Sequence, residues 1–106
     1  MLNLKGKKIL ITQAHDFMGP ALCDMLRDCG AEVIADSRLP TAPDDPQAMI
    51  DAAGAIDVLV LNLALPAPTS WATDIDELEW RQVFEVMVDP LPRFIRAVVP
   101  GMKARG

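Results

Sequence analysis

The residues best placed to do chemistry lie between Thr12 and Gly19, in a segment that reads Thr-Gln-Ala-His-Asp-Phe-Met-Gly. An apolar run at residues 8–12, typical of a strand buried on both faces, leads into this segment, and an amphipathic stretch typical of a helix follows it. In a parallel α/β sheet this first strand-to-helix turn is the usual ligand site, because helix amides face outward there. A dinucleotide site needs glycines in the turn, and only Gly19 fits that pattern. The turn is therefore a candidate site, but not an ordinary nucleotide site.

Other residues with chemical potential carry less weight. Asp36 ends a predicted strand where a dinucleotide-binding protein would hold a ribose, but without the glycines we interpret it as a relic or a loop cap. His15 lies in the same turn, yet a lone histidine in a solvated turn is more often a surface or capping residue. Asn62 borders the cleft and is expected to hydrogen-bond the backbone. Trp71 and Trp80 are expected to serve in packing or oligomer contacts.

The elements that must position these residues follow from the apolar pattern. Short apolar runs predict strands, and apolar spacings of three and four predict helices between them. The predicted strands cover residues 8–12, 32–36 and 57–62, and the predicted helices cover residues 17–29, 46–53 and 76–99. Strands that alternate with helices indicate an α/β fold: a Rossmann-like parallel sheet with flanking helices, with the first strand in the middle.

Capping residues set the expected boundaries of the first two helices. Asp16 is the predicted N-cap of the first helix and Gly30 its stop. Asp45 followed by Pro46 predicts the start of the second helix, with Asp45 as its N-cap. The predicted buried face of the first helix consists of Met18, Leu22, Met25, Leu26 and Cys29.

The predicted helix at residues 76–99 has apolar residues on more than one face. It begins after Asp74 or Asp76 as cap, and Pro90 and Pro92 should kink it or split it near residues 86–89. Its apolar residues include Trp80, Phe84 and Phe94. A helix this broad in apolar character requires cover both from its own sheet and from a partner.

Composition excludes several classes of protein. With 106 residues the chain holds at most one ordinary domain, and its net charge of −5 with ten scattered Lys and Arg residues argues against a nucleic-acid partner. No apolar run approaches the roughly 18 residues of a membrane span, so we expect a soluble, cytoplasmic protein without a membrane partner. Cys23 and Cys29 are expected to be free thiols. A single histidine and the lack of a Cys-x-x-Cys motif argue against a metal site.

Several segments resemble those of short-chain dehydrogenases/reductases. That family's first turn reads Thr-Gly-x-x-x-Gly-x-Gly, and here Thr12 and Gly19 match while Gln13 and Phe17 stand at the first two glycine positions. Met87 also replaces a helical asparagine of the family's catalytic set. Further similar segments are Lys-Gly-Lys at residues 5–7, Gly-Ala-Glu-Val at residues 30–33 and Asp-Val-Leu-Val at residues 57–60.

One branch of this superfamily shows the same departure from the glycine pattern. The spacing of Thr12, Phe17 and Gly19 resembles the Thr-x4-(Phe or Tyr)-x-Gly signature of halohydrin dehalogenases, which keep the fold and have lost the cofactor. Residues 62–68 and 88–98 resemble the B-, D- and G-type members of that family. The resemblance implies cofactor-independent conversion of vicinal halohydrins to epoxides and halide, with reverse epoxide opening by small anions.

The resemblance also implies which residues form the site. An apolar phenylalanine wall beside oriented amides suits a small, weakly hydrated halide, whereas phosphate prefers a glycine cradle. The residues leave a simpler interpretation open, in which Phe17 only packs on the buried face of the helix. The implied halide or nucleophile pocket contains Thr12, Phe17 and Gly19, and the implied substrate side contains Asn62, Leu65 and Pro66.

The resemblance places the family's catalytic serine, tyrosine and arginine downstream of the long helix, and the chain has no tyrosine, so we expect all three beyond Gly106. We therefore expect residues 1–106 to be one Rossmann-like unit, the N-terminal portion of a larger domain. The resemblance also implies a homotetramer built through the helix at residues 76–99. Two alternatives stay open: an NAD(P)-dependent dehydrogenase/reductase that binds cofactor despite Gln13 and Phe17, and a non-catalytic subunit of the same fold.

Overall fold

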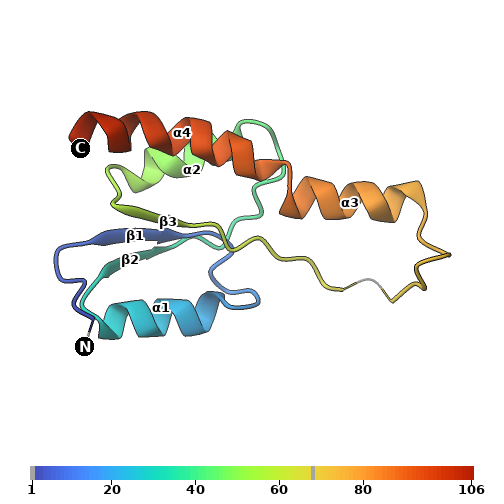
Figure 1. The fold of residues 1–106 in the computed structure, drawn as a ribbon, viewed down its shortest axis with the longest axis horizontal. Coiled ribbons are helices and arrows are strands. Elements are labelled where there is room, and N and C mark those ends of the chain that lie inside the picture. The colour runs from blue at the N-terminus through green and yellow to red at the C-terminus, as the bar shows by residue number, and fades with distance from the viewer. Residues whose placement is uncertain (1, 68) are drawn as a thin grey trace.

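A parallel sheet forms the middle of the protein, with helices on both of its faces (Figure 1). The computed structural model describes residues 2–67 and 69–106. The strands follow the order β2-β1-β3, so the first strand lies in the middle as predicted. They are β1 (Lys8–Ile11), β2 (Glu32–Ala35) and β3 (Val58–Val60). This arrangement confirms the predicted Rossmann-like α/β fold.

The strands are slightly shorter than predicted. The ladder stops one or two residues before the predicted carboxyl ends. The Thr12 amide still donates to the Val60 carbonyl at 3.2 Å, and the Asp36 amide donates to the Ile11 carbonyl at 3.0 Å. The chain therefore stays anchored for one residue beyond β1 and β2 before it turns into the loops that carry the site.

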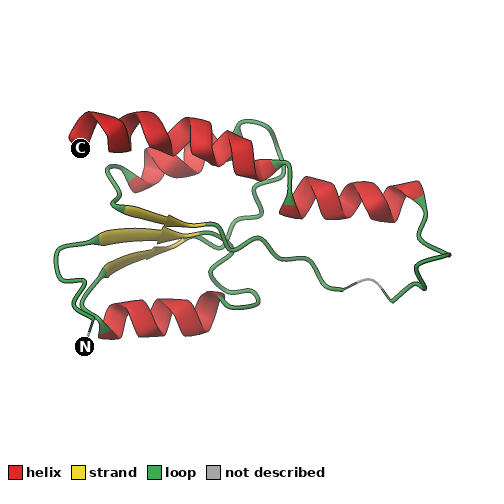
Figure 2. Cartoon of the chain, in the orientation of Figure 1, coloured by secondary structure: helices red, strands yellow, loops and turns green. Residues whose placement is uncertain are grey.

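Helix α1 covers one face of the sheet, and α2 and α4 lie together on the other (Figures 1 and 2). Helix α3 extends away from the sheet, beyond the carboxyl ends of the strands. Within the described residues, no helix is both long and apolar enough to cross a membrane. The helices are α1 (Gly19–Asp28), α2 (Asp45–Ala53), α3 (Glu77–Met87) and α4 (Pro90–Arg105).

Helix α1 begins two residues later than predicted, and Asp16 is not its N-cap. The N-cap is Met18, which makes no side-chain capping bond. The prediction fails because Phe17 has φ of +51°, a left-handed conformation that a right-handed helix cannot include. Gly19 then starts the helix tightly packed, since a Cβ atom there would overlap the Ala14 carbonyl group. The predicted stop at Gly30 is confirmed, with φ of +94°.

The buried face of α1 also differs from the prediction. Cys23 is buried, whereas Met18 and Met25 are exposed. Leu22 and Leu26 pack against the sheet as expected. A spacing of three and four fits two neighbouring stripes on a helix, and the stripe that faces the sheet consists of Gly19, Leu22, Cys23 and Leu26.

Helix α2 has Asp44 as its N-cap, one residue before the predicted cap. Asp45 is instead the first helical residue, and its carboxylate accepts a hydrogen bond from the Ala42 amide at 2.9 Å. Pro46 still lies in the first turn, where its missing donor costs nothing. Asp45 does not cap the helix, because its carboxylate binds the amide of Ala42 in the preceding turn instead of a helical amide.

The predicted helix at residues 76–99 is split into α3 and α4 at Val88 and Asp89, within the expected window. Asp76 is the cap, and its carboxylate accepts from the Glu79 amide at 2.8 Å. The prediction is wrong about the end, since α4 continues to Arg105 with Pro100 inside it. A proline removes one helical hydrogen bond, and packing of the apolar face of α4 on α2 and the sheet offsets that loss.

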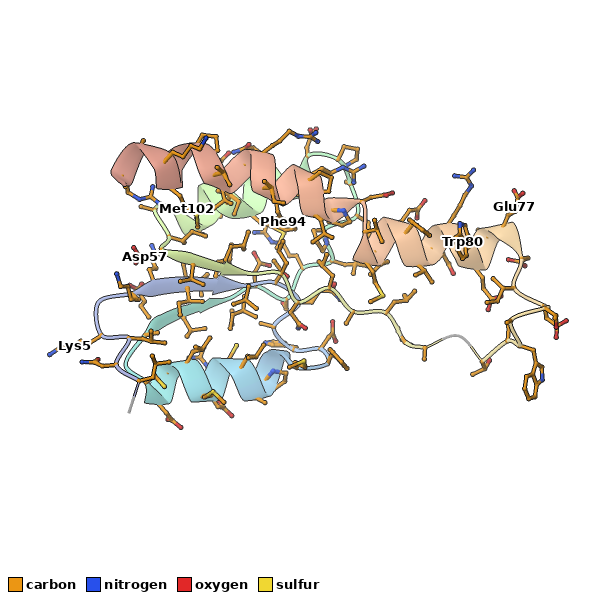
Figure 3. All side chains as sticks on the ribbon, viewed as in Figure 1. Lys5, Asp57, Glu77, Trp80, Phe94 and Met102 are labelled. Atoms are coloured by element: carbon orange, nitrogen blue, oxygen red, sulfur yellow. The ribbon has the colours of Figure 1, made fainter. Side chains whose placement is uncertain are left out.

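The core has two parts, one on each face of the sheet, because alternate residues of β1 point in opposite directions. Leu10 faces α2 and α4, and Phe94 of α4 is fully buried beside it (Figure 3). Ile9 and Ile11 face α1 with Cys23. Thr12 directly follows β1 and therefore lies at the carboxyl edge of the sheet, where the site begins.

Candidate functional site

The site lies at the carboxyl edge of the sheet, between the segments that follow β1 and β3. The chain goes to one side of β1 to form β2 and to the other side to form β3, so the crevice between β1 and β3 is the topological switch point. Ligands of open α/β sheets bind in such a crevice. A cavity of about 610 Å³ opens here, which we call the switch-point pocket. Its lining consists of Gln13, Asp16, Phe17, Leu39 and residues 64–67.

Two residues of the first turn have a backbone conformation that favours glycine. Gln13 has φ of +41° and Phe17 has φ of +51°. Each left-handed residue with a Cβ atom costs on the order of 1 kcal/mol or more. The turn therefore keeps the backbone of a glycine-containing loop, while two large side chains occupy the positions where a dinucleotide would approach.

Phe17 is 79% exposed and lines the switch-point pocket from the α1 side. The simpler interpretation, in which Phe17 packs on the buried face of the helix, is therefore wrong. Leu65 and Pro66 line the opposite side, on the loop after β3. The structure thus brings the predicted halide-side phenylalanine and two of the predicted substrate-side residues around one cavity.

Thr12, Gly19 and Asn62 do not line the pocket but lie beneath it. Thr12 is fully buried, and its hydroxyl donates to the Asn62 carbonyl at 3.1 Å. The Asn62 side-chain amide donates to the Gln13 carbonyl at 3.0 Å and to the Asp16 carbonyl at 2.9 Å. Asn62 thus makes the backbone hydrogen bonds expected of it. These three residues shape the turn, so any effect they have on a ligand acts through Gln13 and Phe17.

Gln13 has a role that the sequence did not indicate. Its side chain is almost completely buried, at 2% exposure, and reaches the loop after β3. Its Oε1 accepts from the Ala64 amide at 3.1 Å, and its Nε2 donates to the Ala64 carbonyl at 2.9 Å. Nε2 also lies 3.3 Å from the Asp16 carboxylate. We call the paired contacts with Ala64 the Gln13 bridge; they cross the crevice between the two walls.

Asp36, which directly follows β2, is paired with Arg38 of the loop that comes after it. Arg38 approaches Asp36 side-on, with Nη2 2.7 Å from Oδ2 and Nε 3.1 Å from Oδ1. These hydrogen bonds hold the pKa of Asp36 below its ordinary value of 3.8, despite partial burial that opposes the shift. The Asp36 carboxylate also accepts from the Arg38 amide at 3.0 Å, as expected of a loop cap.

The remaining candidates lie away from the pocket. His15 is exposed and belongs to a separate shallow hollow beside α1. Trp71 is exposed in the loop before α3. Trp80 lies on α3, remote from the sheet (Figure 3), with its ring centroid 5.1 Å from that of Phe84. None of these residues lines the switch-point pocket.

The dinucleotide expected of this fold does not fit the turn as it stands. The Cβ atoms and side chains of Gln13 and Phe17 fill the glycine positions, and the Gln13 bridge closes the crevice beneath. The Asp36 carboxylate that would meet a ribose is paired with Arg38. What remains is an open pocket with an apolar wall close to the amino end of α1, where a small anion is favoured by the helix dipole.

Two curated proteins resemble the chain along nearly all of its length. An uncharacterized oxidoreductase of Staphylococcus saprophyticus is 28% identical over 97% of this chain. Dehydrogenase/reductase SDR family member 4 of Rattus norvegicus is 27% identical over 97% of this chain. The matches cover 52% and 47% of those proteins, so the chain spans about half of their length. No family model matches the chain.

Solved structures give the same picture of the fold. L-sorbose reductase from Gluconobacter frateurii, complexed with NADPH and L-sorbose, matches with a TM-score of 0.84 and 22% identity, over 99% of this chain and 51% of that one. A protein described as a dehalogenation enzyme also matches with a TM-score of 0.84, at 29% identity over 99% of this chain and 52% of that one. Together with the fold, the two curated relatives support membership of the chain in the short-chain dehydrogenase/reductase superfamily.

Proposed function

We propose that the protein carrying this chain is a cofactor-independent enzyme that converts vicinal halohydrins to epoxides and halide. In the reverse direction it opens epoxides with small anions. The observation that carries the proposal is Phe17, whose ring lines the switch-point pocket from a left-handed position where the superfamily's turn has glycine. The 29% identity to a protein described as a dehalogenation enzyme is consistent with it.

The pocket has properties that suit a halide. A weakly hydrated anion loses little on leaving water, so an apolar wall such as Phe17 does not penalise it as it would a phosphate. The amino end of α1 begins two residues after Phe17 and contributes partial positive charge. Asp16 is the opposing feature, since its carboxylate also lines the pocket. Gln13 Nε2 donates a hydrogen bond to that carboxylate, which offsets part of its negative charge.

In the proposed reaction this chain holds the leaving group while the downstream segment handles the proton. A downstream tyrosine, assigned by the resemblance and held as tyrosinate by a downstream arginine, takes the proton of the substrate hydroxyl, and the resulting alkoxide attacks the neighbouring carbon. The carbon–halogen bond breaks as the carbon–oxygen bond forms, and the halide enters the switch-point pocket against Phe17. Leu65 and Pro66 contact the organic part of the substrate. Holding oxygen and halogen in line is the main contribution of the site.

A second candidate function is an NAD(P)-dependent oxidoreductase. It is favoured by the names of the two curated relatives and by the L-sorbose reductase, whose structure contains NADPH. In that function the dinucleotide would occupy the switch-point crevice, which requires the Phe17 ring to move aside and the Gln13 bridge to open. The two candidates therefore differ in whether a nicotinamide cofactor binds at all.

Fluorescence titration of the intact protein with NADH and NADPH separates the two functions. We expect no saturable change with either cofactor, because the side chains of Gln13 and Phe17 occupy its path. The L-sorbose reductase, whose structure contains NADPH, serves as the positive control. Micromolar binding of either cofactor to the wild-type protein would refute cofactor independence and support the oxidoreductase.

A further inference from the structure

The Gln13 bridge is an unusual use of a buried polar side chain. Gln13 is an acceptor and a donor toward the same peptide unit, with Oε1 3.1 Å from the Ala64 amide and Nε2 2.9 Å from the Ala64 carbonyl. A glutamine side chain is one of the few that can satisfy both groups at once. The contact joins residues 51 positions apart, from the turn after β1 to the loop after β3.

The turn does not require this contact to keep its shape. Asn62 already binds two carbonyl groups of the turn, and the Ala14 amide donates to the Asp36 carbonyl at 2.9 Å. A glycine at position 13 would adopt φ of +41° without steric cost, whereas glutamine pays that cost. Asn62 thus already ties the start of the loop after β3 to the turn, and what glutamine adds is a second connection across the crevice, at Ala64, two residues further along that loop.

Both ends of the bridge belong to walls of the switch-point pocket. Gln13 and Phe17 line one wall, and residues 64–67, beginning with Ala64, form the other. Fixing Ala64 fixes the start of the loop that presents Leu65 and Pro66. Beyond the anchor at Asn62, the length of the glutamine side chain thus sets how far Ala64, and the loop that it begins, stands from the phenylalanine wall.

We infer that Gln13 is a positioning residue that determines anion specificity: its bridge to Ala64 holds the switch-point pocket at a width that admits small anions and rejects larger ones. This inference rests on the proposed function, since it names what sets the selectivity of that same pocket. Gln13 acts through the positions of Phe17 and Leu65, and it makes no bond in the reaction.

Competitive inhibition by two anions tests this role in the intact protein. Bromide and hexafluorophosphate are both weakly hydrated monovalent anions and differ mainly in size, so the ratio of their inhibition constants reports pocket width. The readout is epoxide formation from a chlorohydrin without nicotinamide. The test variant is Gln13→Gly, which removes the bridge and relieves the left-handed backbone, so the fold is retained. Gln13→Asn keeps an amide but is one methylene too short to span the crevice.

We expect wild type to bind bromide far more tightly than hexafluorophosphate. Loss of two hydrogen bonds should lower that preference about tenfold in Gln13→Gly, with a similar loss in Gln13→Asn. Gln47→Ala is the matched control, because Gln47 is an exposed glutamine on α2 whose side chain donates to Asp51, and the anion preference of this variant should equal that of wild type. A purely structural role would lower the melting temperature and the rate without changing the ratio.

The outcomes separate the inference from the function beneath it. If Gln13→Gly is folded and active but discriminates between the two anions as wild type does, the role of Gln13 is refuted and the proposed function stands. If wild type forms epoxide only when a nicotinamide cofactor is supplied, the proposed function fails and the inference fails with it.

Discussion

Replacing Phe17 with alanine and with glycine separates the effect of its backbone strain on stability from the contribution of its ring to anion binding. Phe17 is 79% exposed, so it buries only about a fifth of its surface. For a side chain of roughly 200 Å² that is about 40 Å², or about 1 kcal/mol of stabilisation. Phe17→Ala should therefore lower the free energy of unfolding by about 1 kcal/mol or less, since the ring buries little surface and the left-handed backbone strain is the same in both proteins.

Phe17→Gly should be more stable than Phe17→Ala. Glycine removes a left-handed strain of about 1–2 kcal/mol from the folded state. Its greater conformational freedom in the unfolded chain lowers stability by about 0.4–1 kcal/mol, which offsets part of that gain. The net difference is about 0–1.6 kcal/mol, with a central value of about 0.8 kcal/mol in favour of glycine. Both variants lack the ring, so both should lose anion affinity, by roughly the same factor.

Urea denaturation and bromide inhibition of the intact protein measure these two quantities. Met25→Ala is the control, since Met25 is an exposed apolar residue of α1 away from the pocket and should leave anion affinity unchanged. If Phe17→Gly is less stable than Phe17→Ala, the left-handed strain at this position is not real. If neither variant changes the bromide inhibition constant, Phe17 is not a wall of the anion site.

Other substitutions test the surroundings of the pocket. Asp16→Asn removes the one carboxylate among the residues lining the pocket and should tighten bromide binding several-fold, most clearly at low salt; unchanged or weaker binding would count against an anion site there. Asn62→Ala leaves two carbonyl groups of the turn without their buried donor and should lower the free energy of unfolding by about 2–3 kcal/mol, measured by urea denaturation. A loss below about 0.5 kcal/mol would show that the turn keeps its conformation without Asn62. Because Arg38 lowers the pKa of Asp36, that pair stabilises the fold fully above pH 3.8, and its contribution is lost as the pH falls through the lowered pKa. Asp36→Asn should therefore be up to about 1 kcal/mol less stable than wild type at pH 7, and the difference should shrink steadily in acid. A difference that does not change with pH would exclude the ion pair as its cause. Trp80→Ser on the exposed apolar face of α3 should shift the proposed homotetramer to smaller species in sedimentation, and a wild-type monomer would refute that assembly.

The sheet could be predicted from the sequence because its signals are local. Continuous apolar runs mark the three strands, and alternation with amphipathic segments implies a parallel order with β1 in the middle. The break between α3 and α4 was equally local, since Pro90 cannot continue a preceding helix. These features need no knowledge of what each segment contacts.

The site was only partly predictable. Residue types place Phe17 in the first turn, but its positive φ belongs to a turn that Asn62 binds from a distant segment and in which Gly19 packs on Ala14, and no local pattern encodes these contacts. The Gln13 bridge escaped prediction for a related reason, because it joins residues from two distant segments. The one available signal was a glutamine at a position where glycine relieves strain, which marks a side chain retained for a contact.

Halide release without a cofactor tests the central proposal most directly. The intact protein, freed of bound nucleotide, is given a vicinal bromohydrin in buffer that contains no nicotinamide, and bromide and epoxide are both quantified over time. We expect the two products in equal amounts, at a rate that added NADH or NADPH does not change. Bromide that appears only with cofactor, or oxidation of the alcohol in place of bromide release, would contradict the assignment of the switch-point pocket to a halide.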